Sequence, residues 1–118
     1  MKITIAGSRD FKNLVKVGII LKKLEIIYPE MEILTGGAKG VDEHANELAK
    51  YRGYKRKVIK PDWKQYGRHA GLMRNKKMVE ESDMVVAFWN GKSKGTKNTI
   101  GHATKNGKEL HVYMDSEE

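Results

Sequence analysis

The hydrophobic positions of this chain follow two alternating spacings, short runs typical of strands and longer periods of about 3.6 residues typical of helices. Residues 2–6 contain Ile3 and Ile5 on one side of a short strand that ends at Gly7. The next segment has apolar residues at helical spacing until Pro29 stops it. We therefore expect a strand followed by a helix of about four turns. The apolar side of this helix consists of Leu14, Val17, Leu21 and Leu24.

The same alternation continues to the end of the chain. Further strands are expected at 32–35, 57–59, 84–88 and around 110–113, and further helices at 41–52 before a Gly53 cap, at 69–81 and at about 96–106. Residues 84–88 form the most apolar run, as in a central parallel strand that is covered on both faces. The pattern predicts a three-layer α/β/α sandwich with a five-stranded, mainly parallel sheet. Residues 1–114 form a single domain in this interpretation, and residues 115–118 form an acidic tail.

Four polar or glycine-rich loops follow strands in this arrangement. They comprise residues 7–10, 36–40, 61–68 and 89–96. Because the carboxyl ends of parallel strands meet at one edge of a sheet, we expect all four loops at that edge. Ligands bind there, at the point where the strand order reverses. The sequence therefore predicts a ligand site built from these loops.

The loop at 36–40 has the layout of a turn that holds phosphate. It joins an expected strand directly to an expected helix and contains Gly36, Gly37 and Gly40. Glycine allows an oxyanion to approach the backbone closely, and the following helix points its free N–H groups at the anion. The loop matches neither the dinucleotide-binding fingerprint nor the P-loop. A tight connection between strand and helix is therefore the alternative.

Composition narrows the class of partner. The 118 residues include 23 Lys and Arg against 15 Asp and Glu, a net charge of +8, which favours partners that carry phosphate. The basic residues are spread along the chain, which indicates a solvated surface more than a groove for nucleic acid. Cysteine is absent, and no apolar stretch reaches the roughly 20 residues of a membrane span. We expect a cytoplasmic protein with no membrane partner, and self-association is left open.

Five segments carry a resemblance to a known family. They read Ala-Gly-Ser-Arg-Asp-Phe at 6–11, Thr-Gly-Gly-Ala-Lys-Gly-Val-Asp at 35–42, Pro-Asp-Trp at 61–63, Arg-Asn at 74–75 and Phe-Trp-Asn-Gly-Lys-Ser-Lys-Gly-Thr at 88–96. In this order they resemble the SLOG superfamily of Rossmann-like domains, named for the Smf (DprA) DNA-processing proteins and the LOG enzymes. Within it, the chain is most similar to the stand-alone YspA-like family of bacterial and phage proteins. The resemblance implies a Rossmann-like fold.

The resemblance also implies a site for a nucleotide or a nucleotide-derived ligand. The residues that it assigns to ligand or phosphate binding are Gly7, Ser8, Arg9, Gly36, Gly37, Gly40, Arg74, Ser93, Gly95 and Thr96. LOG enzymes carry a catalytic glutamate where this chain has Thr99, and Asn90 stands where the family more usually has aspartate. Whether the protein is an enzyme is therefore open, with Asp42 and Asp10 as the weak catalytic candidates.

Other candidates have a structural alternative beside the functional one. Arg9 and Arg74 have the geometry for phosphate but could form surface ion pairs instead. Trp63 and Tyr66 could stack on a base or anchor the core. Ser93 could hold phosphate or cap the helix that follows it. No metal is expected, because the four histidines lack metal-binding spacing, and no cofactor is expected beyond a nucleotide ligand.

Three hypotheses of function follow. The first is binding of a nucleotide-type ligand, as a sensor or a processing component. The second is LOG-like hydrolysis of a nucleotide N-glycosidic bond. The third is binding of single-stranded DNA, as the resemblance to Smf proteins and the net charge of +8 suggest.

Overall fold

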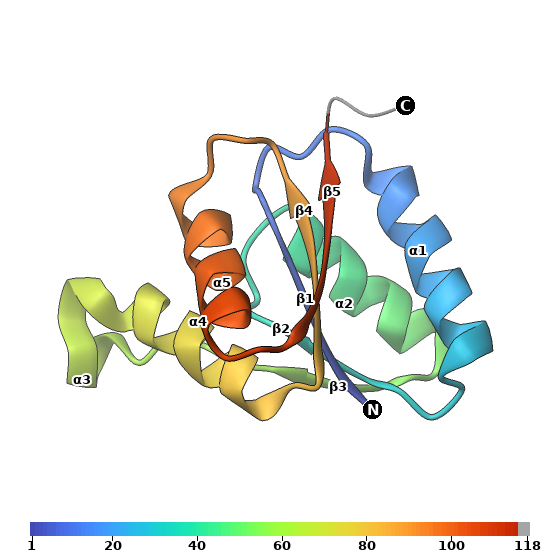
Figure 1. Cartoon of the computed structure of the whole chain (residues 1–118), viewed down its shortest axis with the longest axis horizontal. Coiled ribbons are helices and arrows are strands. Elements are labelled where there is room, and N and C mark those ends of the chain that lie inside the picture. The colour runs from blue at the N-terminus through green and yellow to red at the C-terminus, as the bar shows by residue number, and fades with distance from the viewer. Residues whose placement is uncertain (116–118) are drawn as a thin grey trace.

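A computed structural model of the chain describes residues 1–115 and shows a Rossmann-like α/β/α sandwich (Figure 1). Its single sheet has the strand order β3-β2-β1-β4-β5, and all four pairings are parallel. The strands are β1 (Lys2–Gly7), β2 (Glu32–Thr35), β3 (Lys55–Val58), β4 (Met84–Trp89) and β5 (Glu109–Met114). The predicted five-stranded parallel sheet is confirmed.

Helices cover both faces of the sheet. They are α1 (Leu14–Ile27), α2 (Val41–Arg52), α3 (Trp63–Tyr66), the 3-10 turn η1 (Gly67–His69), α4 (Ala70–Glu81) and α5 (Lys94–Lys105). Helices α1 and α2 pack together on one face, and α4 and α5 pack together on the other (Figure 1). As expected, Gly53 ends α2 in a left-handed conformation. None of the helices within residues 1–115 has the length and apolarity to cross a membrane.

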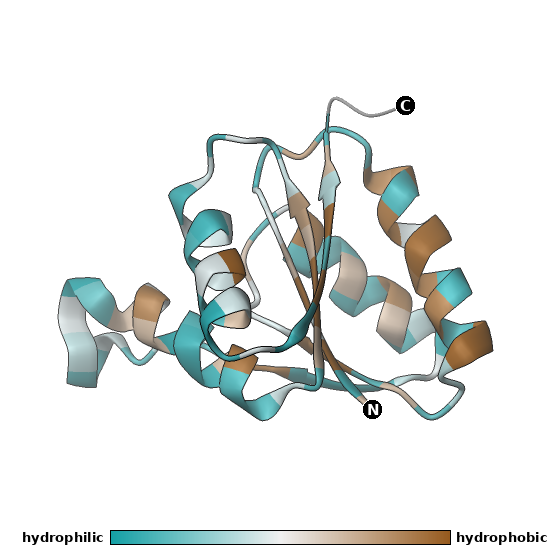
Figure 2. Ribbon diagram, in the orientation of Figure 1, coloured by the Kyte–Doolittle hydropathy of each residue, from teal (hydrophilic) through white to brown (hydrophobic). Residues whose placement is uncertain are grey.

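The larger hydrophobic core lies between the sheet and the α1 and α2 layer. Ile3 and Ile5 of β1 point into it, as the alternation in the sequence predicts, and so does Phe88 of β4. The ring of Phe88 lies edge-on to Phe11, with centroids 5.6 Å apart, and stacks on Tyr113 at 5.5 Å. The hydropathy of the residues agrees with this packing: the central strands are among the most hydrophobic elements of the domain (Figure 2). Residues 84–88 are all buried, which confirms the central strand.

The third strand and the loop after it differ from the sequence-based prediction. Strand β3 lies at Lys55–Val58 rather than at 57–59. Residues 61–68, predicted to be a loop, contain α3 and most of η1. The carboxylate of Asp62 caps α3, its Oδ1 accepting a hydrogen bond of 3.0 Å from the N–H of Gln65. A helix of four residues is too short to show an apolar period, so the pattern missed it.

Asp115, which the sequence placed in an acidic tail, is bonded to the body of the domain. Its Oδ2 accepts a hydrogen bond of 2.9 Å from the N–H of Lys12, and its Oδ1 accepts one of 3.2 Å from the N–H of Asn13. The side chain of Asp115 thereby stabilises the turn that leads into α1. The rest of the predicted tail, residues 116–118, lies outside the described residues.

Candidate functional site

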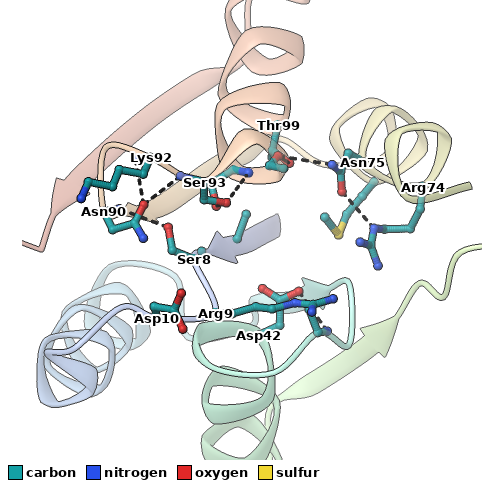
Figure 3. A pocket seen from close by; sticks show the side chains of 16 residues that line it. Ser8, Arg9, Asp10, Asp42, Arg74, Asn75, Asn90, Lys92, Ser93 and Thr99 are labelled. Atoms are coloured by element: carbon teal, nitrogen blue, oxygen red, sulfur yellow. Dashed lines mark hydrogen bonds between the residues drawn. The ribbon is translucent and has the colours of Figure 1, made fainter. Parts of the chain in front are cut away.

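A cavity of about 540 Å³ opens at the C-terminal ends of β1 and β4 (Figure 3). The register pairs Gly7 with Phe88, so the loops after these two strands leave the sheet side by side. The chain runs from β1 outward to β2 and β3 and then crosses to β4, which makes this the switch point of the strand order. The lining residues are Ala6, Gly7, Ser8, Arg9, Asp10, Ala38, Asp42, Arg74, Asn75, Met78, Asn90, Lys92, Ser93, Gly95, Thr96 and Thr99.

Asn90 organises the loop after β4. Its Oδ1 accepts hydrogen bonds of 2.9 Å from the backbone N–H groups of both Lys92 and Ser93. Its own N–H donates to Oγ of Ser8 at 3.1 Å, which ties the loop after β4 to the loop after β1. Ser8 is 1% exposed, so this hydrogen bond is partly buried. It fixes the two loops relative to each other.

The N-terminus of α5 forms the wall next to this loop. Oγ of Ser93 accepts a hydrogen bond of 3.3 Å from the N–H of Thr96, so Ser93 caps the helix as the structural alternative predicted. Gly95 and Thr96 both line the cavity, and the first-turn N–H of Gly95 has no acceptor within residues 1–115. An exposed N–H at the positive end of a helix favours an anion in the cavity.

Helix α4 contributes Arg74, Asn75 and Met78 to the cavity. Nδ2 of Asn75 donates to the carbonyl of Gly95 at 3.3 Å and to Oδ1 of Asn98 at 3.2 Å, while its Oδ1 accepts a hydrogen bond of 2.9 Å from Nε of Arg74. Asn75 thus connects α5 to the guanidinium of Arg74 (Figure 3). Residues 74, 75 and 78 follow helical spacing, which is the signal by which the sequence could have identified Asn75 and Met78.

The glycine-rich loop after β2 packs against charged residues of the site. Nη1 of Arg74 donates a hydrogen bond to the carbonyl of Gly36. A Cβ on Gly40 would lie only 2.5 Å from the carbonyl oxygen of Arg9. Gly36, Gly37 and Gly40 do not line the cavity. The loop is a tight connection into α2. Its glycines also leave space for Arg9 and Arg74, because a side chain at Gly40 or Gly36 would collide with them.

Asp42 is the buried carboxyl of the cavity. The residue is 6% exposed, and its Oδ2 accepts a hydrogen bond of 3.3 Å from the N–H of Ala38. Burial raises the pKa of Asp42 from its usual 3.8 to about 6, although the Ala38 N–H and the Arg74 guanidinium favour the charged form. Burial also lowers the pKa of Arg74, and the Asp42 carboxylate opposes that change. Arginine stays charged at neutral pH, so the cavity contains a guanidinium beside a carboxyl that titrates close to neutrality.

Most of the predicted site residues meet in this cavity. Gly7, Ser8, Arg9, Arg74, Ser93, Gly95 and Thr96 line it, together with the two catalytic candidates Asp10 and Asp42. Three cations, Arg9, Arg74 and Lys92, and two carboxylates, Asp10 and Asp42, line the cavity, so it has an excess of positive charge. The rest of the lining was not among the predicted binding residues and consists of Ala6, Ala38, Asn75, Met78, Asn90, Lys92 and Thr99.

The aromatic candidates lie elsewhere. Trp63 and Tyr66 belong to α3, and neither lines the cavity. Strand β3 is at the edge of the sheet, with β2 between it and β1, so the segment after β3 emerges away from the switch point. In Figure 1, α3 projects from the body of the domain, and Trp63 is 61% exposed. The segment after β3 leaves the sheet at the predicted edge, because β3 is parallel to the other strands, but the expectation that it converges with the other three loops is wrong.

Comparison with known proteins agrees with this fold. The sequence is 30% identical over 113 residues to the Gene 61 protein of Mycobacterium phage D29, and the alignment covers 90% of each chain. Among solved structures, DNA processing protein A (DprA) of Streptococcus pneumoniae superposes with a TM-score of 0.80 at 18% identity, covering 94% of this chain and 49% of that one. The chain thus spans about half the length of that protein.

A second solved structure is similar. DprA of Helicobacter pylori, whose single-stranded DNA binding mode has been described, has a TM-score of 0.75 at 23% identity and covers 95% of this chain and 64% of that one. At these identities the two DprA structures show a shared fold. Residues 1–66 match the model of the YspA, cpYpsA-related SLOG family, and these residues include the loops after β1 and β2. The chain belongs to the YspA, cpYpsA-related SLOG family.

Proposed function

We propose that the switch-point cavity, defined by the lining residues given above, binds a nucleotide or a nucleotide-derived ligand through its phosphate. The observation that carries this proposal is the hydrogen bonding of the Arg74 guanidinium. Its Nε and Nη1 are bonded to Asn75 and Gly36, which orient the guanidinium, whereas its Nη2 has no acceptor among the described residues. A guanidinium that is oriented and still has a free donor is suited to an oxyanion.

Two further features support an anionic group in the same place. Arg9 is exposed and lines the cavity with Arg74, so a second guanidinium can reach the ligand. Gly95 offers an N–H at the start of α5, and Thr96 offers a hydroxyl. A volume of about 540 Å³ is within the range of small-molecule sites and holds a nucleoside in addition to a phosphate. Such binding suits a sensor or a processing component.

Arg9→Ala tests the proposal, because its side chain is exposed and its removal leaves the core intact. The protein is titrated calorimetrically with the four nucleoside monophosphates and their diphosphates. We expect the affinity for the bound nucleotide to fall by about ten- to a hundredfold, since a hydrogen bond to a charged group contributes about 1.5–3 kcal/mol. Native mass spectrometry of freshly purified protein shows which nucleotide to examine first.

Arg56→Ala is the matched control. Arg56 is an exposed arginine of β3 that bonds to Asn46 and lines neither the switch-point cavity nor the cavity beside α3. The Arg56→Ala substitution removes the same charge as Arg9→Ala. Equal losses of affinity in the two variants would therefore indicate a general effect of charge rather than a site. No binding of any nucleotide to the unmodified protein overturns the proposal.

A second candidate function is hydrolysis of a nucleotide N-glycosidic bond, and the observation that favours it is Asp42. A buried carboxyl with a pKa raised to about 6 in a cavity has the properties of a general acid or base near neutral pH. Asp10, the other carboxyl of the cavity, is exposed. Thr99 lines the cavity where LOG enzymes have their glutamate, so this chemistry would depend on Asp42.

A further inference from the structure

A second cavity of about 340 Å³ lies beside the first, between α3 and α4. We call it the α3–α4 cavity. Arg74 lines both cavities and, among residues 1–115, is the one residue that they share. Residues 73, 74, 77 and 80 lie on one side of α4 at helical spacing and face the α3–α4 cavity, whereas 74, 75 and 78 face the switch-point cavity. The Arg74 side chain therefore stands at the boundary between two adjacent spaces.

The chemistry of the α3–α4 cavity resembles that of a nucleotide site. Lys60, Lys76 and Lys77 line it together with Arg74, against the two carboxylates of Asp62 and Glu80. The Asp62 carboxylate already caps α3 through Gln65. Cations are therefore in excess, and the three lysines are exposed and able to follow a ligand.

The remaining lining is flat or apolar. Tyr66, which the sequence singled out for base stacking and which does not reach the switch-point cavity, lines the α3–α4 cavity at 38% exposure. Ile59, Ala70 and Met73 supply apolar surface. An aromatic ring beside apolar side chains and surrounded by cations can bind a base and a phosphate together.

We propose that the ligand continues past Arg74 into the α3–α4 cavity, so that the protein binds two nucleotide units joined through phosphate, with Arg74 at the linkage. This inference rests on the proposed function of the switch-point cavity. One nucleotide unit occupies the switch-point cavity, and the second stacks on Tyr66 with its phosphate near Lys76 and Lys77. The linked units belong either to a free dinucleotide or to a single strand of nucleic acid.

The test compares one unit with two in calorimetric titrations of the full chain. The probes are the mononucleotides AMP, GMP, CMP and UMP and the linear 5′-phosphorylated dinucleotides pApA, pGpG, pCpC and pUpU. We expect the best dinucleotide to bind about tenfold more tightly than its mononucleotide, the gain of one additional stacked base. The double variant Lys76→Ala/Lys77→Ala and the single variant Tyr66→Ala should lose that gain and keep the affinity for the mononucleotide. Tyr66→Phe should retain it, because the ring remains.

The matched control is Lys22→Ala/Lys23→Ala, which removes two consecutive exposed lysines from α1 on the opposite face of the sheet. Equal affinity for both classes of probe, or an equal loss in the control, overturns the two-unit proposal while mononucleotide binding still supports the proposed function. Failure of all eight probes overturns both. A 12-residue single-stranded oligonucleotide separates the sources. Binding that depends on Lys76 and Lys77 supports the proposal with a strand as the ligand, and binding of the dinucleotide alone supports it with a free dinucleotide.

Discussion

The guanidinium of Arg74 occupies the space that a side chain on Gly36 would need. Its Nη1 lies 2.6 Å from the position of an ideal Cβ on Gly36, and Oδ2 of Asp42 lies 3.0 Å from that position. Residue 36 is therefore the place where the loop after β2 makes space for the two central charged groups of the cavity. The Arg74 guanidinium reaches the site from α4, across a separation of 38 residues in the chain.

Gly36→Ala should reduce ligand binding more than stability. The backbone of Gly36 does not have a positive φ, so alanine is tolerated, but its Cβ displaces the flexible end of Arg74. We expect the affinity for the nucleotide to fall by about tenfold or more, as for loss of one charge-assisted contact of about 1.5–3 kcal/mol. Calorimetric affinity and the melting temperature are the two measurements.

Gly40→Ala supplies the contrast, because Gly40 has a φ of +84° and its added Cβ would meet the backbone of Arg9. That variant should lose stability, by about 1–3 kcal/mol for a backbone conformation that only glycine adopts readily and by more for the contact. A Gly36→Ala protein that melts as low as Gly40→Ala would show that Gly36 is needed mainly for folding.

Asp42→Asn should remove a pH dependence of stability. Below pH 3.8 the carboxyl is protonated in both the folded and the unfolded state, and above about pH 6 it is ionised in both. Because the folded pKa is raised, the free energy of unfolding falls as the pH rises through this window, by about 3 kcal/mol. The variant, which has no charge to bury, should lack that decrease. Urea denaturation at pH 4 and pH 7 measures it.

Asp10→Asn is the control for this measurement, since Asp10 is an exposed carboxyl of the same cavity. The difference in stability between the two pH values should match that of the unmodified protein. Should Asp42→Asn keep the full pH dependence, the Asp42 carboxyl would have to be more hydrated than its burial indicates.

Asn90→Ala should loosen the loop after β4. The change removes the acceptor of two backbone N–H groups, each worth about 0.5–1.5 kcal/mol, so a stability loss of about 1–3 kcal/mol is expected together with weaker nucleotide binding. Asn90→Asp keeps an oxygen in that position and should be close to the unmodified protein in stability. Thermal unfolding of both variants measures this, and an equal loss in both would contradict a role for the Asn90 oxygen as acceptor.

Rapid hydrolysis of nucleoside monophosphates is not expected. The resemblance to LOG enzymes places Thr99 at the position of their glutamate. Its Oγ1 donates to the carbonyl of Gly95 at 3.2 Å, and a neutral hydroxyl cannot act as a carboxylate base. Loss of a general base alone lowers a rate by about 10²–10⁴-fold. Release of free base from a panel of nucleoside monophosphates is the assay. Turnover that Asp42→Asn abolishes would establish the hydrolase instead.

Much of the fold follows from local features of the sequence. Burial repeats with the period of the backbone, so apolar patterns show which side of an element is buried. The alternation of Ile3 and Ile5 and the continuous apolar run at 84–88 are such patterns, and Pro29 marks where the first helix ends. The local chemistry of the loops, together with the family resemblance, identified Arg9, Asp42 and Ser93, but it missed Asn90 and Lys92.

Only the tertiary structure decided which loops meet. Strand order is not encoded in the alternation of strands and helices, and here it places β3 at the edge. Trp63 and Tyr66 therefore lie outside the first cavity, and Tyr66 lines the second. The packing of α4 on the sheet also brings Arg74 against Gly36 of the loop after β2. Periodic patterns report the environment of each residue along its own element, whereas contacts between distant residues depend on how the elements pack. The sequence by itself therefore determined the elements and the type of chemistry at one edge of the sheet, and packing determined that Arg74 joins two cavities.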